Sequence, residues 1–344
     1  MKYFNCDYNE GAYPPILRRM NETNLCQSIG YSEDEYCEEA RSIIRGLCGA
    51  PDAAVHFLVG GTQANLTVIS AALRSHQGVI SASTGHINVH ETGAIEATGH
   101  KVLSVNTEDG LLTAEMVEKV CHDHFVDEAF EHMVQPGMVY ISSPSELGTI
   151  YTRESLSDLR RVCDKYGLLL YLDGARLGYG MADRANDIDL PFLYNVCDVF
   201  YIGGTKQGAL MGEAVVIRNE SLKKDFRYMI KQRGGMFAKG RLLGIQFLEL
   251  FRDGAYFKLA EHADRLADDI RKAFEDKGYR SLVQSGTNQI FVIVPNDAME
   301  KLNKKYVSSN TGPYDENHTV LRFCTSWATN PTDAAELIED IKAL

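Results

Sequence analysis

The sequence predicts an α/β fold, in which a three-layer domain with a mostly parallel sheet precedes a smaller α+β domain. Short apolar runs alternate with helical patterns up to about residue 236, which is typical of buried strands covered by helices on both faces. From about Phe237 the pattern changes to long helical stretches with a few strand-like runs. The expected domains are therefore residues 1–236 and 237–344, with an N-terminal segment that can pack on the smaller one.

A series of apolar runs predicts the strands of the first domain. One intervening helix carries all of its expected signals, because Thr152 can cap it, apolar residues recur along one face, and Gly167 can end it. Ligands of such sheets bind beyond the carboxyl ends of the strands, so the residues that follow each run are the candidates for a site. The predicted strands are 55–58, 78–82, 101–105, 138–142, 168–172, 199–202 and 214–217.

The second domain is expected to mix helices and strands. A long helical stretch runs from Leu242 past Ala273, and a final helix begins near Thr332. Between them, the runs 289–294 and 319–324 are rich in β-branched and aromatic residues and predict strands.

Composition excludes some classes of partner. The chain has 344 residues, of which 44% are hydrophobic and 24% charged, as in ordinary globular proteins. A formal net charge of −12 argues against nucleic acid or an anionic membrane surface as a partner. No apolar run is long enough for a membrane span, and the first residues start no signal peptide. The eight cysteines are scattered without a Cys-x-x-Cys pair, which indicates reduced thiols in a cytoplasm and no metal site.

Two strand ends carry the most informative residues. Lys206 follows the run 199–202 across Gly203, Gly204 and a threonine, and Asp173 directly follows the run 168–172. A lysine amine and a carboxylate at such positions suit pyridoxal phosphate (PLP), which needs a Schiff-base lysine and an acid beside its pyridinium nitrogen. The alternatives are an exposed loop lysine and a local ion pair between Asp173 and Arg176, worth under about 1 kcal/mol at a surface.

Two arginines are candidates for binding a carboxylate. Arg176 lies in the turn after the strand, and its planar guanidinium matches a carboxylate group. Arg322 lies among apolar neighbours in the run 319–324, where a guanidinium needs a partner. An internal acid would satisfy Arg322 equally well, so both readings stay open.

Two further segments suit the same cofactor. Gly60, Gly61 and Thr62 precede a predicted helix, where glycines and the positive end of the helix dipole favour a phosphate; the same residues also suit a plain turn and helix cap. His86 follows the run 78–82, where its imidazole can stack on a pyridine ring or simply bond to the loop backbone. A metal pair with the nearby Glu91 lacks a third ligand.

Together these segments resemble the low-specificity L-threonine aldolase and β-eliminating lyase family of PLP enzymes, within the aspartate-aminotransferase-like superfamily (fold type I). The resemblance extends from Asp7 to the Arg322 strand. Its most specific motif is Leu172-Asp173-Gly174-Ala175-Arg176-Leu177. The other matching segments are Gly60 to Asn65 (phosphate cup), His86 (ring-stacking histidine), Thr205 to Gly208 (Schiff-base lysine motif) and Arg322 (second carboxylate-binding arginine).

The resemblance implies roles for individual residues. Lys206 would form the Schiff base and Asp173 would hold the ring nitrogen. The cofactor would also contact Gly61, Thr62, Gln63, His86, Arg176 and Thr205. The substrate would be bound by Asp7, Arg176 and Arg322, with the two arginines holding its carboxylate.

The chain departs from the family pattern in two places. Where aldolases commonly open with Asp-Leu-Arg-Ser-Asp-Thr-Val-Thr, this chain has Asn5 to Gly11, so Cys6 replaces the serine and only Asp7 corresponds. The family's Glu-Asn-Thr-His-Asn-Gly loop becomes Ser143 to Gly148, so Glu146 stands in place of the histidine near the substrate hydroxyl. A carboxylate is a weak base at neutral pH unless burial raises its pKa.

The resemblance thus implies a PLP-dependent lyase of amino acid metabolism, with Lys206, His86, Asp173 and Glu146 as catalytic residues. It would cleave the Cα–Cβ bond of L-threonine or a related β-hydroxy-α-amino acid to glycine and an aldehyde. The alternatives are β-elimination or another PLP reaction, and a non-enzymatic binding protein, which predicts loss of Lys206 or Asp173. A nucleotide-dependent oxidoreductase would need a Gly-x-Gly-x-x-Gly motif, which is missing.

The segment from Arg233 to Arg241 is rich in glycine and cations. It is either a hinge between the domains or, by the resemblance, a segment that reaches the cofactor of a neighbouring subunit. The second interpretation implies a homodimer or homotetramer.

Overall fold

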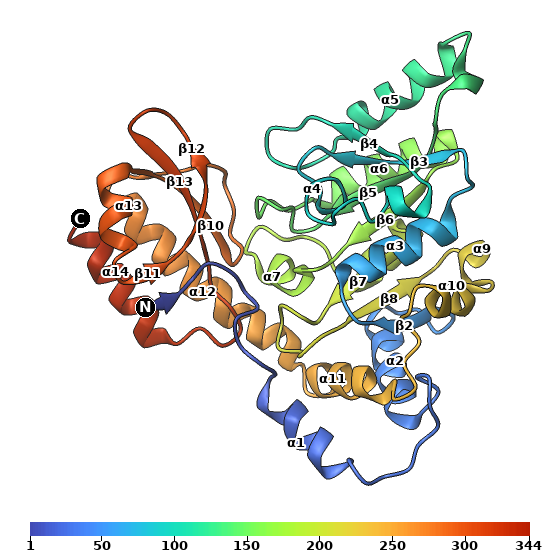
Figure 1. Cartoon of the computed structure of the whole chain (residues 1–344), viewed down its shortest axis with the longest axis horizontal. Helices are drawn as coiled ribbons and strands as arrows, with labels where there is room; N and C mark the ends of the chain where they lie inside the picture. Colours follow the sequence, from blue (N-terminus) through green and yellow to red (C-terminus); the bar gives the residue numbers. More distant parts are fainter.

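The computed structural model describes residues 1–344 and contains two main sheets, each with its own core (Figure 1). The larger sheet has seven strands in the order β2-β8-β7-β6-β5-β3-β4. All the predicted strands of the first domain occur in it. Their bounds are β2 (Ala54–Leu58), β3 (Gln77–Ala82), β4 (Val102–Val105), β5 (Gln135–Ser142), β6 (Leu169–Asp173), β7 (Val199–Gly203) and β8 (Glu213–Ile217).

The large sheet is mostly parallel. Strands β4, β3, β5, β6 and β7 are joined by parallel pairing, while β8 runs antiparallel to both β7 and β2. As a result the carboxyl ends of β2, β3, β5, β6 and β7 meet at one edge, together with the first residue of β8. The candidate residues that follow these strands therefore come together at this edge.

Helices cover both faces of the sheet, which confirms the predicted three layers. On one face α3 (Gly61–Ala72) and α10 (Phe226–Gln232) share a core with the strands, and on the other α2, α5, α6, α8 and α11 do so. The predicted signals of α6 hold, because Thr152 Oγ1 accepts a hydrogen bond from the Ser155 N–H and Gly167 ends the helix at a φ of +66°. The bounds of this second group are α2 (Glu35–Leu47), α5 (Ala114–Val126), α6 (Arg153–Tyr166), α8 (Leu190–Val196) and α11 (Arg241–Phe251).

The smaller sheet is antiparallel, with the strand order β12-β13-β10-β9. Helices α12 (Ala255–Asp276) and α14 (Pro331–Lys342) share its core. The N-terminal strand β1 (Lys2–Tyr3) pairs in parallel with β11 (Tyr306–Val307), so the start of the chain lies on this part of the molecule. The strands of the sheet are β9 (Arg280–Ser281), β10 (Gln289–Pro295), β12 (Ser309–Pro313) and β13 (His318–Cys324).

The long helical stretch predicted after Leu242 is two helices. The chain breaks between α11 and α12, where Gly254 has a φ of +66°, a conformation that glycine adopts without strain. Leu243 and Phe247 of α11 belong to the core of the large sheet, whereas Leu266 of α12 belongs to that of the small one. The domain boundary after residue 236 stays a prediction, and this packing favours a boundary within α12.

The remaining helices are short, and no helix is both long and apolar enough to cross a membrane. These helices are α1 (Pro14–Glu22), α4 (His86–Val89), α7 (Leu177–Ala182), α9 (Glu220–Lys223) and α13 (Asn296–Leu302), with 3-10 turns at Glu96–Thr98 and Phe130–His132.

Candidate active site

Asp173 is the centre of a buried hydrogen-bond network at the end of β6. Its Oδ2 accepts hydrogen bonds from Tyr140 Oη at 2.6 Å and Asn65 Nδ2 at 3.1 Å. Its Oδ1 accepts from the hydroxyl of Tyr201 and from the Ala175 N–H. Burial, and next the Asp173 charge, raise the pKa of both tyrosines well above the usual value, so both remain donors. Four donors around one carboxylate stabilise its anionic form.

The network extends to His86. Asn65 Nδ2 also donates to Glu91 Oε1 at 2.6 Å, and the same oxygen lies 2.7 Å from His86 Nδ1. A proton on Nδ1 satisfies this contact and fixes the orientation of the ring. The His86 side chain remains 37% exposed, so one face of the imidazole is free to stack on a ligand.

Lys206 lies in the tight loop after β7. Its backbone carbonyl accepts a hydrogen bond of 2.5 Å from Tyr179 Oη, which fixes the loop against α7. Burial and then the neighbouring Arg176 lower the pKa of the lysine, although the Asp7 and Asp173 charges act in the opposite direction. A lowered pKa favours the neutral amine, which is the nucleophilic form.

The N-terminus of α3 lies at the same edge of the sheet and begins at Gly61. A methyl group on Gly61 would lie 2.9 Å from Tyr201 Oη, whereas one on Gly60 would meet nothing within 4 Å. The first backbone N–H groups of a helix have no partner within it and suit an anion. The Gln63 side chain instead secures the turn, since it accepts from the Val59 N–H and donates to the Arg233 carbonyl, both at 3.1 Å.

Arg176 and Asp7 form a two-pronged ion pair. Nε and Nη2 of Arg176 lie 2.7 Å and 3.1 Å from the two carboxylate oxygens of Asp7, and Asn288 Nδ2 donates to the same carboxylate at 2.9 Å. Burial alone would raise the pKa of Asp7, but Arg176, Lys206 and Asn288 together outweigh it and hold that pKa below the usual value. Asp7 was predicted to bind the substrate, and that prediction is untested. A carboxylate repels another anion, so its observed contact makes Asp7 the residue that orients Arg176.

Arg322 lies on β13 and is anchored to the same N-terminal segment. Its Nη2 donates to the Asn5 carbonyl at 3.0 Å and to Ser309 Oγ at 3.2 Å, while its Nε is buried without a partner. Both predicted carboxylate-binding arginines are therefore fixed by residues on either side of Cys6. An unpartnered guanidinium N–H is costly unless a ligand satisfies it.

Glu146 lies in the loop after β5, as its place in the sequence required. Its Oε1 accepts hydrogen bonds from Ser142 Oγ at 2.7 Å and the His86 N–H at 2.8 Å, which leaves Oε2 available to a substrate. Burial raises the pKa of Glu146, and the Asp173 charge adds to this effect. The pKa of Glu146 is therefore shifted in the direction that lets a carboxylate serve as a base near neutral pH.

Some residues of this site were not predicted from the sequence. Tyr140 and Tyr201 were assigned only as strand residues, and their side-chain direction follows from the register of β5, β6 and β7. Glu213 did carry a signal, because it is a single acid before the apolar run 214–217. Thr205, which was predicted to bind phosphate, donates from its hydroxyl to Glu213 at 3.2 Å and accepts from the Gly212 N–H at 3.0 Å.

These residues fit pyridoxal phosphate. The site offers a half-buried lysine of lowered pKa, an anchored carboxylate and a histidine with a free face. It also offers a glycine-lined helix N-terminus where an added methyl group would fill the space. Each of these features matches a part of the cofactor, namely its aldehyde carbon, ring nitrogen, ring face and phosphate.

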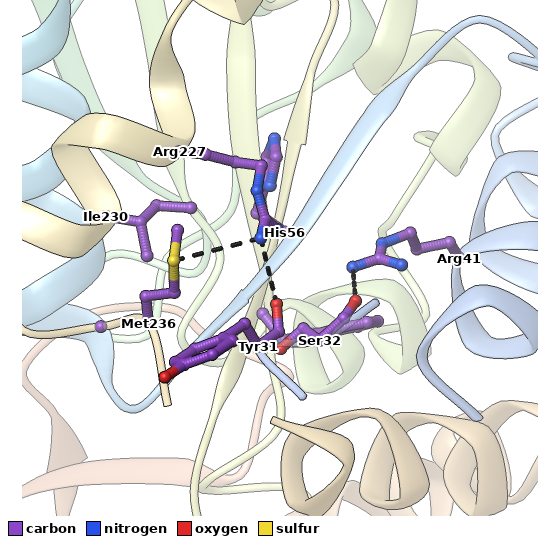
Figure 2. Close-up of a pocket in the computed structure, with 9 residues that line it drawn as sticks. Tyr31, Ser32, Arg41, His56, Arg227, Ile230 and Met236 are labelled. Carbon is purple, nitrogen blue, oxygen red and sulfur yellow. Dashed lines mark hydrogen bonds between the residues drawn. The ribbon is translucent and has the colours of Figure 1, made fainter. Parts of the chain in front are cut away.

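A separate cavity lies away from these residues, beside β2 and α10 (Figure 2). It measures about 10 Å³, which leaves room for about one water molecule. Burial lowers the pKa of His56 in its wall to about 3, so this histidine is neutral. The arginines beside it are used structurally, since Arg41 donates to the Ser32 carbonyl and Arg227 to the Tyr31 carbonyl at 3.3 Å. This cavity is too small for a substrate.

Comparison with known proteins identifies the family. The sequence matches the β-eliminating lyase family over residues 14–296. The chain belongs to this family. It is 30% identical to the low-specificity L-threonine aldolase of Pseudomonas sp. (strain NCIMB 10558), over 99% of this chain and 97% of that protein.

Solved structures agree with this membership. The structure of Leishmania major threonine aldolase matches with a TM-score of 0.97 and 41% identity, covering 100% of this chain and 99% of that one. An aspartate aminotransferase mutant from Thermus thermophilus matches with a TM-score of 0.72 at 16% identity, over 99% of this chain and 91% of that one, which shows the shared fold. As a member of the family, the protein is a PLP-dependent lyase, and its fold is that of the aminotransferase-type enzymes.

Proposed function

We propose that the protein cleaves the Cα–Cβ bond of L-threonine or a related β-hydroxy-α-amino acid and releases glycine and an aldehyde. The observation that carries the proposal is Glu146, a buried carboxylate held beside His86 at the same edge of the sheet as Lys206 and Asp173. This arrangement provides a base for a β-hydroxyl group next to a PLP site. The threonine aldolases of Pseudomonas and Leishmania, which the chain resembles along its whole length, support it.

The cofactor, when bound, supplies an electron sink for the pair released at the substrate's α-carbon. Lys206 would provide the amine that holds it. Asp173, whose carboxylate accepts four hydrogen bonds, would lie beside the ring nitrogen and favour its protonated form. The N–H groups at the start of α3 would bind the phosphate, with Thr205 in the neighbouring loop, and His86 would cover one side of the ring.

Arg176 and Arg322 bind the substrate carboxylate and so set the direction of the Cα–Cβ bond. Arg176 is fixed by Asp7 and Arg322 by the Asn5 carbonyl, so neither side chain has to be ordered when the substrate arrives. Arg322 also has an unpartnered Nε that a carboxylate oxygen would satisfy. Orientation of the bond before the reaction is a main source of rate enhancement in such sites.

Glu146 takes the proton of the substrate hydroxyl. The ionised form is the active base, and burial raises its pKa above the usual value, so activity should fall as the pH drops through that raised pKa. The Ser142 hydroxyl and the His86 N–H favour the ionised form by donating to Oε1.

Replacing Glu146 with glutamine should lower kcat by about 10²- to 10⁴-fold with little change in PLP affinity, because the amide has the same shape but cannot accept the proton. Steady-state cleavage of L-threonine and cofactor titration would measure the two effects. Ser142→Ala is the matched control. It removes one donor to the ionised carboxylate, so the acid side of its pH–rate profile should move to higher pH while activity at alkaline pH persists. Full activity of the glutamine variant would exclude Glu146 as the base.

Gly61→Ala should weaken PLP binding by about tenfold or more, because the new methyl group lies 2.9 Å from Tyr201 Oη and forces a shift in the wall that bears Asp173. Gly60→Ala is the control, since it meets nothing within 4 Å and should bind PLP almost normally. Absorbance titration of each apoprotein with PLP measures the difference. Equal affinities would show that the cofactor does not lie against the start of α3.

β-Elimination is the competing reaction within the family. Incubating the holoenzyme with L-threonine, L-serine and L-cysteine distinguishes the two. The proposal predicts glycine and acetaldehyde from L-threonine, whereas pyruvate from L-serine or L-cysteine, without aldol cleavage, would establish the eliminating activity instead.

We also propose that the protein works in the cytoplasm as a homodimer or homotetramer in which residues 233–241 approach a second subunit. The cytoplasmic location is supported by the net charge of −12 and by the buried unpaired cysteines. The oligomer is supported by apolar side chains that are exposed near this segment, such as Tyr228 and Leu25. Analytical ultracentrifugation would detect a monomer, which would contradict it.

A further inference from the structure

Glu213 is a buried acid at the junction of the two loops that face the phosphate. It is the first residue of β8 and is 3% exposed. In the sheet it pairs with Gly203 of β7, three residues before Lys206, and with Leu58 of β2, three residues before Gly61. A change at Glu213 therefore acts on both loops at once.

Its carboxyl group is only half satisfied. Oε1 accepts the hydrogen bond of 3.2 Å from Thr205 Oγ1, while Oε2 is buried and has no partner. A buried oxygen without a partner costs much more free energy when it carries charge than when it is neutral. The contact geometry therefore favours the carboxylic acid over the carboxylate.

On balance the surroundings of Glu213 raise its pKa, although individual charges act in opposite directions. Burial raises its pKa to about 8, Lys206 opposes the rise, and Asp173 adds to it. The other titratable groups that face it are tyrosines, whose own pKa values burial raises further; they are Tyr171, Tyr201 and Tyr256. On the β2 side it pairs with Leu58, which brings no charge. A cofactor phosphate at the start of α3 would add a further anion near Glu213.

We propose that Glu213 is a positioning residue that stays a neutral carboxylic acid while the cofactor phosphate is bound, and that its ionisation sets an alkaline limit on cofactor binding. As an acid it accepts from Thr205 through Oε1 and fixes this loop residue without adding a negative charge beside the phosphate. As a carboxylate it would repel both the phosphate and Asp173. This role rests on the PLP site described above but not on the identity of the substrate.

The sign of the effect on folding follows from the same pKa. Because the pKa of Glu213 in the folded protein lies above its value of 4.5 in an unfolded chain, its contribution to stability is complete below pH 4.5. That contribution is lost as the pH rises toward 8. Glutamine has the shape of the neutral acid and does not ionise, so Glu213→Gln should remove this pH dependence without changing the contacts at neutral pH.

The test compares PLP affinity of wild-type apoprotein and Glu213→Gln by absorbance titration from pH 6.5 to pH 9.5. At pH 7 the two dissociation constants should agree within about threefold, and at pH 9 the wild-type protein should bind about tenfold more weakly than the variant. Urea unfolding of both apoproteins provides a second readout. The wild-type free energy of unfolding should decline more steeply between pH 5 and pH 8.

Two results would overturn the proposal. One is a glutamine variant that already binds PLP more than tenfold more weakly at pH 7, which would mean that the charge is needed. The other is a pair of affinity curves with the same slope. If the variant does not fold, the PLP affinity of the wild-type protein is enough to test the proposal. A wild-type affinity that does not fall above pH 8 would exclude the alkaline limit. Failure of wild-type protein to bind PLP at any pH would instead overturn the cofactor site itself.

Discussion

Lys206→Ala abolishes the visible absorbance of bound PLP and lowers kcat by at least about 10³-fold, since loss of a covalent nucleophile removes most of the rate enhancement of such enzymes. The structure explains why no other group can replace it. Lys206 is a half-buried lysine at the carboxyl edge of the sheet, and its amine is biased toward the neutral form by desolvation and by Arg176. No other lysine takes part in the hydrogen bonds of Asp173 and Glu91.

The control for this variant is Lys224→Ala, since Lys224 is exposed and lies after α9, away from the carboxyl edge of the sheet. It should retain the cofactor spectrum and full activity. Circular dichroism of the Lys206 variant should match that of the wild-type protein, because the amine has no hydrogen-bonded partner whose loss would disturb the core. An alanine variant that keeps the PLP absorbance band would show that the cofactor is attached elsewhere.

Asp173→Asn gives the second large effect, with kcat reduced on the order of 10²-fold or more and weaker retention of PLP. The amide has nearly the same size but no charge, so it cannot keep the ring nitrogen protonated. Its NH₂ group would also face one pair of donors, either Tyr140 with Asn65 or Tyr201 with the Ala175 N–H. Leaving buried donors unpaired should cost about 1–3 kcal/mol of stability in addition.

Tyr171→Phe is the matched comparison for Asp173→Asn. Tyr171 lies two residues earlier on the same strand, but its hydroxyl donates to Asn65 Oδ1 at 2.7 Å and does not contact Asp173. Its loss should reduce kcat only a few-fold. Stopped-flow absorbance and thermal melts of both variants separate the chemical effect from the loss of stability. Similar kcat values for the two variants would mean that the Asp173 charge has no special role.

The sequence predicted the frame of the site well, and the reason is physical. Asp173 and Lys206 each follow a nearly unbroken apolar run. A parallel sheet brings residues that follow its strands to one edge, independently of the conformation of the loops. Strand positions and the capping of α6 by Thr152 follow from local patterns of the same kind, whereas Glu146 was singled out by the family resemblance.

The features of the site that were not predicted from the sequence depend on contacts between distant segments. The hydroxyls of Tyr140 and Tyr201 reach Asp173 only because of the register of three strands, and single strands do not specify register. Asp7 and Arg176 are 169 residues apart in the sequence, so this ion pair was not predictable from neighbouring residues. The reversal of β8, which brings Glu213 to the carboxyl edge, likewise depends on pairing with both β7 and β2.

The central claim is that one aldehyde-bearing cofactor is attached to Lys206 between Asp173 and the start of α3. Borohydride reduction of the PLP-loaded protein, followed by peptide mapping by mass spectrometry, tests it directly. A single phosphopyridoxyl label on the peptide that contains Lys206 is the expected result. A label on another lysine, or no label on a protein that retains its fold, would contradict the account.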